Sequence, residues 1–280
     1  VVGSALLLVG VAFKMSWIPF HMWTPDVYQG APAPVTGFLA GAVKVAVFAF
    51  AMRWLMMAQG DYLGLLLLGL TVMAVLSMVM GNLLALRQNN LKRLLGYSSI
   101  AHMGYVIVTL AASATHGATT LSTALEGAGI YLLTYASMTM LAFAVISQLA
   151  AQDRRFESGT LVHYEGLLFQ QPLLASCLIL AMLALAGMPL TAGFIGKYYL
   201  VLVAVDSQLW LLLGLLVLGS SLGLYYYLRV ILVLCKTPVS DRQLVLGTSE
   251  KLLLLLLAAT TLWLGLYPTP VIKWVQLAIA

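Results

Sequence analysis

The sequence predicts an all-α, polytopic membrane protein of about eight transmembrane helices, two of them broken, and three observations support that fold class. The chain is 62% hydrophobic and 8% charged, with a mean hydropathy of +1.01. Its apolar residues form runs of roughly 20 or more, the length that crosses the hydrocarbon core of a bilayer. Charged residues gather in short segments between the runs, which is typical of membrane spans and their loops.

The predicted spans follow one another with short connections. They cover residues 2–23, 35–57, 62–84, 94–113, 121–149, 172–205, 209–234 and 252–267, and an amphipathic tail ends at Ala280. A proline-rich turn is expected over 24–34. The sixth run is too long for one straight helix, and we expect the segment AGMPLTAGF at 186–194 to interrupt it.

Composition disfavours several other functions. The net charge of +5 comes from 14 basic residues spread over short loops, which favours membrane topology over nucleic-acid binding. Cys177 and Cys235 lie in different apolar runs, so neither a disulfide nor a metal framework is expected. The sequence has no glycine-rich phosphate loop, HExxH motif or nucleotide-binding unit. We therefore expect that the chain itself binds no metal, redox cofactor or nucleic acid.

The loop charges predict an orientation in the membrane. One set of alternate loops carries most of the basic residues: Arg87, Lys92, Arg93, Arg154, Arg155, Lys236, Arg242 and Lys251. The other set carries little beyond Arg53 and Lys273. Because cytoplasmic loops are enriched in lysine and arginine, we expect the first set and the turn at Asp26 to face the cytoplasm.

Three lysines are predicted to lie inside apolar spans: Lys14, Lys44 and Lys197. A charged side chain at a helix centre costs roughly 2.5 to 3.5 kcal/mol on insertion scales, so such residues are usually functional. The alternative is snorkelling, in which the ammonium reaches the headgroups, but Lys44 has roughly nine apolar residues on its shorter side at about 1.5 Å each. Burial disfavours the ammonium and a neighbouring group can restore it. We therefore expect all three lysines to transfer protons.

Proline and glycine are expected to break two of the spans near these lysines. Pro19 lies in the first run, and Gly187, Pro189 and Gly193 lie in the sixth. A broken helix frees backbone groups that lipid cannot satisfy, so it is tolerated where it is buried in protein or lines a hydrated cavity. We expect these four residues to line such cavities. An ordinary proline kink is the alternative.

Other polar groups in or near the spans have more than one interpretation. His102 is central in the fourth run, where it is either a proton relay or a hydrogen-bonded packing residue. His21 is expected at an interface, as an accessory group that stabilises the turn. Glu126 is either a solvated cap or an accessory acid on the exit side. The tyrosines at 225–227, with Arg229, are typical of an interfacial belt and anchor.

Three segments carry a resemblance to a known family. They are PFHMWTPDVYQGAPAPVTGFLAGAVK at 19–44, NLKRLLGYSSIAHMGY at 90–105 and GMPLTAGFIGKYY at 187–199. The sequence resembles the antiporter-like membrane subunits of respiratory complex I, nearest to the subunit N branch of bacterial NADH–quinone oxidoreductases. Relatives in this family include multisubunit cation/proton antiporters and membrane subunits of energy-converting hydrogenases.

The resemblance implies an inverted-repeat bundle of fourteen helices, of which this chain would supply helices seven to fourteen as one transmembrane domain. Residues 1–57 would end the first repeat, 58–235 would form the second, and 236–280 would be a loop and the C-terminal helix. The N-terminal half of that architecture, with the glutamate that pairs with the lysine at Lys14, would be absent, as expected of a fragment. Lys14, Lys44 and Lys197 match the family's proton-carrying lysines, and His102 falls on its polar axis.

The resemblance also implies a function. The chain would be a proton-translocating subunit of NADH:quinone oxidoreductase, a translocase of the bacterial inner membrane, beside other antiporter-like and small membrane subunits. NADH, FMN, iron–sulfur clusters and quinone would be bound by partner subunits. The alternatives are a subunit of a sodium/proton antiporter or of a membrane-bound hydrogenase, and a purely structural membrane subunit.

Overall fold

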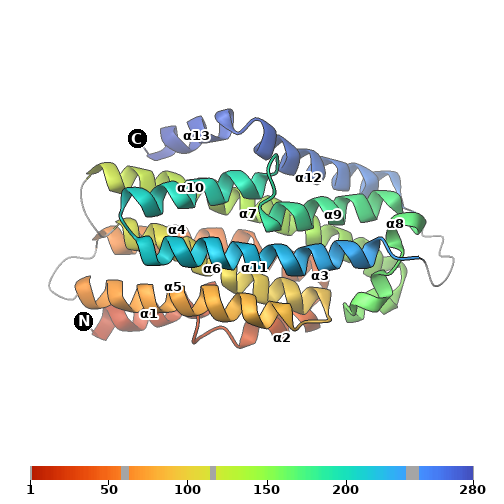
Figure 1. Ribbon diagram of the computed structural model, residues 1–280, viewed down its shortest axis with the longest axis horizontal. Coiled ribbons are helices and arrows are strands. Elements are labelled where there is room, and N and C mark those ends of the chain that lie inside the picture. Colours follow the sequence, from red (N-terminus) through yellow and green to blue (C-terminus); the bar gives the residue numbers. More distant parts are fainter. Residues whose placement is uncertain (1, 58–62, 114–117, 238–245, 280) are drawn as a thin grey trace.

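The computed structural model describes residues 2–57, 63–113, 118–237 and 246–279, and it confirms the predicted fold class. Most helices run roughly along the long axis of one bundle (Figure 1). Among the described residues the β-type contact is an isolated bridge between Asn90 and Thr160. Within those ranges, six helices are long and apolar enough to cross a membrane, and Val2–Met15 and Pro172–Ala186 are shorter apolar helices.

The helices are labelled in chain order. They are α1 (Val2–Met15), α2 (Trp23–Gly30), α3 (Ala33–Ala40), α4 (Ala42–Met57), α5 (Leu63–Leu86), α6 (Leu91–Ser113), α7 (Ala118–Gln152), the 3-10 helices η1 (Arg154–Ser158) and η2 (Leu161–Tyr164), α8 (Leu167–Gln170), α9 (Pro172–Ala186), α10 (Ala192–Asp206), α11 (Trp210–Leu234), α12 (Thr248–Leu266) and α13 (Thr269–Ile279). Helix α5 has 24 residues. At about 1.5 Å per residue it is roughly 36 Å long, which exceeds the hydrocarbon core of a bilayer at about 30 Å.

Helix α6 is the central rod of the bundle. It contacts α2, α5, α7, α10 and α11, and Arg93, Tyr97 and Ser113 are its residues that are not buried. Small residues allow close approach, since a Cβ on Gly81 of α5 would lie 2.8 Å from the backbone nitrogen of Ala101. A helix enclosed in this way has little contact with lipid, so its polar groups must find their partners inside the protein.

The first predicted break is present at Pro19, but the segment that follows it differs from the prediction. Helix α1 ends at Met15 and α2 begins at Trp23, so the interruption includes Pro19. The predicted turn over 24–34 is wrong for its first part, because Trp23–Gly30 is helical. Pro25 is compatible with that helix because it lies in the first turn, where a backbone N–H has no partner within the helix.

The second predicted break is confirmed, since α9 ends at Ala186 and α10 begins at Ala192. A further interruption, which the sequence does not predict, separates α3 from α4 at Gly41. The spans predicted over 62–84, 94–113, 121–149, 209–234 and 252–267 correspond to α5, α6, α7, α11 and α12. The predicted start of the third span, Tyr62, lies outside the described residues.

The loops that carry the basic residues meet at one end of the bundle, on the right in Figure 1. The connection between α5 and α6 contacts the segment after α7 through the bridge from Asn90 to Thr160. Lys236, which follows α11, pairs with Glu165 at 2.7 Å. The predicted gathering of positive charge is therefore present among the described residues, and Arg242 lies outside them.

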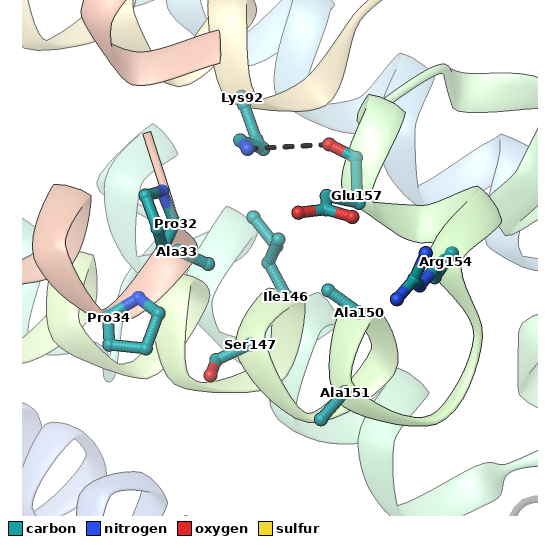
Figure 2. A pocket seen from close by; sticks show the side chains of 10 residues that line it. All are labelled: Pro32, Ala33, Pro34, Lys92, Ile146, Ser147, Ala150, Ala151, Arg154 and Glu157. Atoms are coloured by element: carbon teal, nitrogen blue, oxygen red, sulfur yellow. Dashed lines mark hydrogen bonds between the residues drawn. The ribbon is translucent and has the colours of Figure 1, made fainter. Parts of the chain in front are cut away.

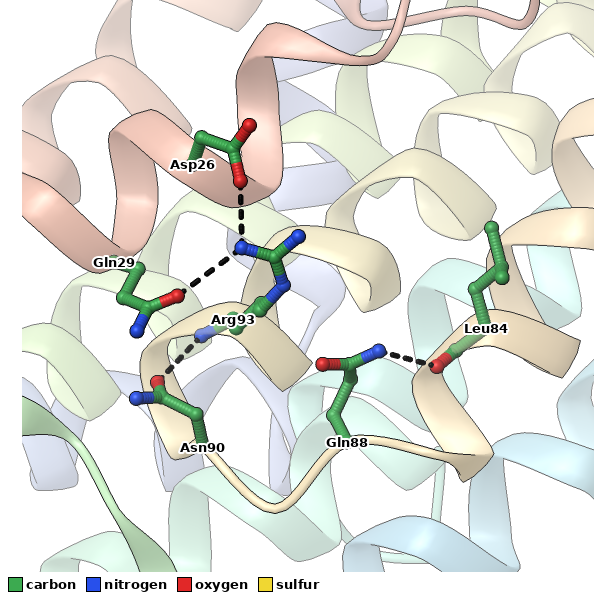
Figure 3. Close-up of polar contacts among 6 residues, drawn as sticks. All are labelled: Asp26, Gln29, Leu84, Gln88, Asn90 and Arg93. Atoms are coloured by element: carbon green, nitrogen blue, oxygen red, sulfur yellow. Dashed lines mark hydrogen bonds and ion pairs between the residues drawn. The ribbon is translucent and has the colours of Figure 1, made fainter.

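The N-terminal helices join this end through α2. Arg93 Nη1, at the start of α6, donates to Asp26 Oδ1 at 2.6 Å and to Gln29 Oε1 at 3.1 Å (Figure 3). Asn90 Oδ1 accepts from the Arg93 backbone N–H at 3.0 Å. Asp26 therefore lies at the basic end, as the sequence predicts.

Candidate functional site

Lys44 is buried inside the bundle, with 1% of its surface exposed. It lies on α4, three residues after the interruption at Gly41. Its Nζ donates to Ser99 Oγ at 2.5 Å and lies 5.9 Å from the centre of the Tyr28 ring. Ser99 Oγ is also 2.6 Å from the Tyr135 hydroxyl. A hydroxyl of α6 thus links the ammonium on α4 to a tyrosine on α7.

His102 is buried about one turn beyond Ser99 on α6, between two tyrosines. Its Nδ1 lies 2.7 Å from Tyr131 OH, and its Nε2 lies 3.1 Å from Tyr227 OH, which also contacts Ser98 Oγ. A neutral imidazole donates from one nitrogen and accepts at the other. One tyrosine hydroxyl must therefore accept a hydrogen bond from the ring N–H while the other donates one to the unprotonated nitrogen. Moving the ring proton to the other nitrogen reverses the direction of both hydrogen bonds, so that each hydroxyl exchanges its role as donor or acceptor.

Lys197, with 8% of its surface exposed, is held by the end of a broken helix. Its Nζ donates to the carbonyl oxygens of Leu185 and Ala186, at 3.2 and 2.7 Å, and to Ser220 Oγ at 2.7 Å. Leu185 and Ala186 end α9, and the last carbonyls of a helix have no partner within it. They also form the negative end of the helix dipole, which stabilises a cation. The break therefore supplies acceptors for this ammonium.

Two glycines allow α9, α10 and Lys197 to come this close. Gly187 caps α9 with a φ of +82°, and a Cβ there would lie 2.8 Å from Lys197 Cδ. Gly193, in the first turn of α10, packs so tightly on α9 that a Cβ would lie 1.7 Å from the Ala184 carbonyl oxygen. Both glycines predicted at the break thus shape the Lys197 site. Whether they line a hydrated cavity remains a prediction.

Lys44, His102 and Lys197 are buried in the same part of the bundle. We call these three residues, with the hydroxyls that contact them, the lysine row. His102 is within electrostatic range of both lysines. Its ring centre lies 5.4 Å from that of Tyr135, which hydrogen-bonds Ser99 and so leads towards Lys44. Its hydrogen-bond partner Tyr131 packs against α10, the helix of Lys197, since a Cβ on Gly196 would lie 3.1 Å from the Tyr131 ring.

Lys14 lies outside this row. It is exposed near the end of α1 in the described residues, so its role in proton transfer stays a prediction. The buried face of α1 carries Leu8, Val11, Ala12 and Met15. Lys14 lies on another face of a helix that is apolar all round, where sequence alone does not define the buried side.

The remaining predicted residues lie near the ends of the broken helices or on the far side of α7. Pro19 and Pro189 are exposed, and His21 is partly buried in the interruption between α1 and α2. Glu126 is partly buried on α7, and its Oε1 accepts from Gln276 Nε2 of α13 at 2.9 Å. Glu126 therefore ties α7 to the C-terminal helix. It is not a hydrogen-bond partner of Lys44 or of Lys197.

The hydroxyls of the lysine row were not predicted as site residues. They belong to Tyr28, Ser98, Ser99, Tyr131, Tyr135, Ser220 and Tyr227. The interfacial belt predicted at 225–227 is wrong for Tyr226 and Tyr227, which are buried, whereas Tyr225 is 64% exposed. One signal was available, because Tyr131 and Tyr135 are four residues apart and so share a helix face.

Carboxylates are not paired with Lys44 or Lys197 among the described residues. The ion pairs there are peripheral and join Arg93 to Asp26, Arg155 to Asp153, and Lys236 to Glu165. The same part of the chain holds no group of three or more His, Cys, Asp or Glu side chains that could bind a metal ion. Amines, an imidazole and hydroxyls are the groups that the row offers. Such groups can hold a proton and exchange it along hydrogen bonds.

Comparison with known sequences places the chain in a family. Residues 1–223 match the family described as NADH:quinone oxidoreductase/Mrp antiporter, transmembrane. A NADH-quinone oxidoreductase subunit N from Ectopseudomonas mendocina is 46% identical over 279 residues, which are 98% of this chain and 55% of that protein. The chain therefore spans about half the length of this relative.

Solved structures agree. A chain of respiratory complex I from Thermus thermophilus with bound aureothin superposes with a TM-score of 0.80 at 38% identity, over 96% of this chain and 57% of that one. A chain of an archaeal membrane-bound sulfane sulfur reductase gives 0.87 at 28% identity, over 96% and 53%. A chain of the Mrp complex from Dietzia gives 0.80 at 20% identity, over 100% and 59%, and shares the fold. The chain belongs to the NADH:quinone oxidoreductase/Mrp antiporter family of transmembrane proteins.

Proposed function

We propose that the chain moves protons across a membrane as part of a proton-translocating subunit of NADH:quinone oxidoreductase. The observation that supports this most is the burial of Lys44 and Lys197, without a carboxylate partner among the described residues, within electrostatic range of the buried His102. Burying an ammonium is costly even when it is hydrogen-bonded. A chain whose function is to change the charge of these groups has a reason to keep them.

Protons would move along the lysine row by exchange between neighbours. Lys44 would pass a proton through Ser99 and Tyr135 towards His102, and Lys197 would accept it from the other side and deliver it to an exit. Water beside the broken helices would complete the gaps. The two ammonium groups repel each other in a medium of low dielectric constant, so loading one favours unloading the other.

Lys14 would also take part in proton transfer. It is exposed in the described structure. We propose that its acidic partner is supplied by a neighbouring protein segment.

Electron transfer would take place in partner subunits, which would bind NADH, FMN, iron–sulfur clusters and quinone. The chain itself would have no redox centre and would act with other antiporter-like and small membrane subunits. The basic end of the bundle would face the cytoplasm of a bacterial cell, because short cytoplasmic loops are enriched in lysine and arginine.

The test is to replace Lys44 or Lys197 by methionine in the full-length subunit of the assembled complex. Each variant is expected to lower the number of protons moved per electron pair, because methionine fills the space and cannot carry charge. Lys251→Met is the control, since Lys251 is exposed on α12. An unchanged proton-to-electron ratio in both buried variants would show that the chain is a structural subunit.

A cation/proton antiporter subunit is the alternative, and membership of a family that includes Mrp antiporters favours it. Sodium is bound by oxygen ligands, whereas the lysine row presents two ammonium groups that would repel the ion. Vesicles containing the assembled complex distinguish the two. Proton movement that follows quinone reduction supports the oxidoreductase, and movement that follows an imposed sodium gradient supports the antiporter.

A further inference from the structure

A cavity of about 570 Å³ lies at the basic end of the bundle, apart from the lysine row. It is formed where the start of α3, the start of α6, the end of α7 and η1 meet (Figure 2). Its charged wall consists of Lys92, Arg154 and Glu157, and Ile146 and Pro34 contribute to its apolar wall.

The cavity lies at the depth expected for lipid headgroups. Three candidate membrane spans begin or end at its walls: Ala33–Met57, Leu91–Ser113 and Leu121–Gln152. The ends of spans mark the boundary between the hydrocarbon core and the polar headgroup region. A ligand would therefore reach this cavity most easily from the headgroup layer.

Lys92 supplies a buried cation to the cavity, with 2% of its surface exposed. Its Nζ donates to the backbone carbonyls of Ala31, at 3.0 Å, and Glu157, at 3.4 Å. An ammonium has three donors, so one remains for a ligand. Arg154 adds an exposed guanidinium on the same wall. Two such donors suit a phosphate, because charge-assisted hydrogen bonds to phosphate oxygens are the strong ones.

Glu157 gives the cavity a second kind of charge. Its carboxylate lies between Lys92 and Arg154 in the view of Figure 2, and it forms no ion pair with any described residue. A carboxylate at this position repels a ligand that is purely anionic. It suits a ligand whose phosphate is followed by a primary ammonium, which can donate hydrogen bonds to the carboxylate.

The apolar part of such a ligand has a surface to lie on. Val35 and Phe38 follow Pro34 along α3, away from the basic end, and they are 49% and 60% exposed. Phe38 is four residues after Pro34 and shares its helix face, so it offers apolar surface next to the cavity, on the side of the membrane interior.

We propose that this cavity binds the headgroup of a phosphoethanolamine lipid, with the phosphate on Lys92 and Arg154 and the ammonium on Glu157. The charge pattern selects the headgroup, and the exposed apolar face of α3 selects a lipid over the free headgroup. This inference does not depend on the proposed proton transfer, because it uses none of the lysine row.

The experiment uses the full-length protein, purified in detergent, with phosphatidylethanolamine, phosphatidylglycerol or phosphatidylcholine of the same acyl chains added. Bound lipid is counted by native mass spectrometry. Phosphatidylethanolamine is expected to bind most tightly, and Arg154→Ala to weaken it about tenfold, as expected for one charge-assisted interaction. Glu157→Gln is expected to remove the preference over phosphatidylcholine. Lys92 is left intact, because its two carbonyl contacts join α6 to its neighbours.

Arg155→Ala is the matched control. Arg155 is the next residue of η1, but it pairs with Asp153 at 2.9 Å and does not line the cavity, so its loss is expected to leave lipid binding unchanged. Equal binding of all three lipids by the native protein and the variants would indicate adventitious lipid and overturn the proposal. A preference for phosphatidylglycerol would overturn the assignment of a phosphoethanolamine headgroup. If soluble glycerophosphoethanolamine bound as tightly as the lipid, the proposed contact between α3 and the acyl chains would be overturned.

Discussion

Lys44 and Lys197 are both buried, yet the protein holds them in different ways. Lys197 donates to two backbone carbonyls at the end of α9 and to Ser220. Lys44 donates to one hydroxyl, that of Ser99, which also contacts Tyr135. Backbone carbonyls are fixed and only accept, whereas a hydroxyl rotates and can donate as well. We therefore expect Lys197 to hold its proton more firmly than Lys44 before passing it on.

The two environments also depend on different kinds of backbone interruption. At Lys197 the helix is fully broken, and the break exposes the carbonyls that bind the ammonium. At Lys44 the interruption at Gly41 is a kink inside one span, and the structure gives the ammonium a side-chain partner instead. A change to the α9–α10 break should therefore disrupt the hydrogen bonds of Lys197 and leave those of Lys44 in place.

Gly193→Ala should have the largest effect, because the new Cβ would lie 1.7 Å from the Ala184 carbonyl oxygen and force α10 away from α9. We expect a loss of about 3 kcal/mol or more, at the upper end for overpacking in a well-packed core. Thermal unfolding of the purified protein measures it. Gly214→Ala is the control, since a Cβ there meets nothing within 4 Å. Equal stability of the two variants would contradict the tight junction.

Ser99→Ala and Ser220→Ala compare the two lysines directly. Removing Ser99 takes away the hydrogen bond that the structure gives Lys44 and its link to Tyr135, so proton transfer should fall about tenfold, in line with a hydrogen bond to a charged group. Ser220→Ala leaves Lys197 with two carbonyls, and a loss of about twofold is expected. Proton uptake by vesicles during quinone reduction measures both. A greater loss for Ser220→Ala would reverse the assignment of roles.

Tyr227→Phe tests the part of the row around His102. It removes one of the two hydroxyls that contact His102 and leaves Tyr131, so we expect proton transfer to fall about threefold to tenfold, as for the loss of one hydrogen bond. Tyr225→Phe is the matched control, two residues away and exposed. Identical rates for the two variants, measured in the same vesicle assay, would mean that His102 is a packing residue.

Arg93→Ala should have the smallest effect. Arg93 ties α2, which carries Tyr28 beside Lys44, to α6, which carries Ser99 (Figure 3). The pair with Asp26 is exposed, and exposed ion pairs contribute roughly 0.2 to 1 kcal/mol. We expect a change of stability in that range by thermal unfolding, and no change in proton transfer. A large loss of transfer would mean that the Lys44 site depends on α2 more than its buried contacts indicate.

The sequence predicts the spans and the α9–α10 break well, because length, hydropathy and the segment at 186–194 define them locally. It also predicts that Lys44 and Lys197 are enclosed, and this is confirmed. Lys14 shows the limit, since α1 is apolar on every face and its buried side is set by its neighbours. Tyr226 and Tyr227 show the same limit, because a tyrosine near a span end suits an interface as well as a buried hydrogen bond.

The most direct test of a single row is the double variant Lys44→Met with Lys197→Met in the assembled complex, compared with each single variant by protons moved per electron pair. If both lysines serve one path, each single variant loses the same number of protons and the double variant loses no more. If the losses of the single variants add in the double variant, the lysines serve separate paths, and the row that joins them through His102 would be contradicted.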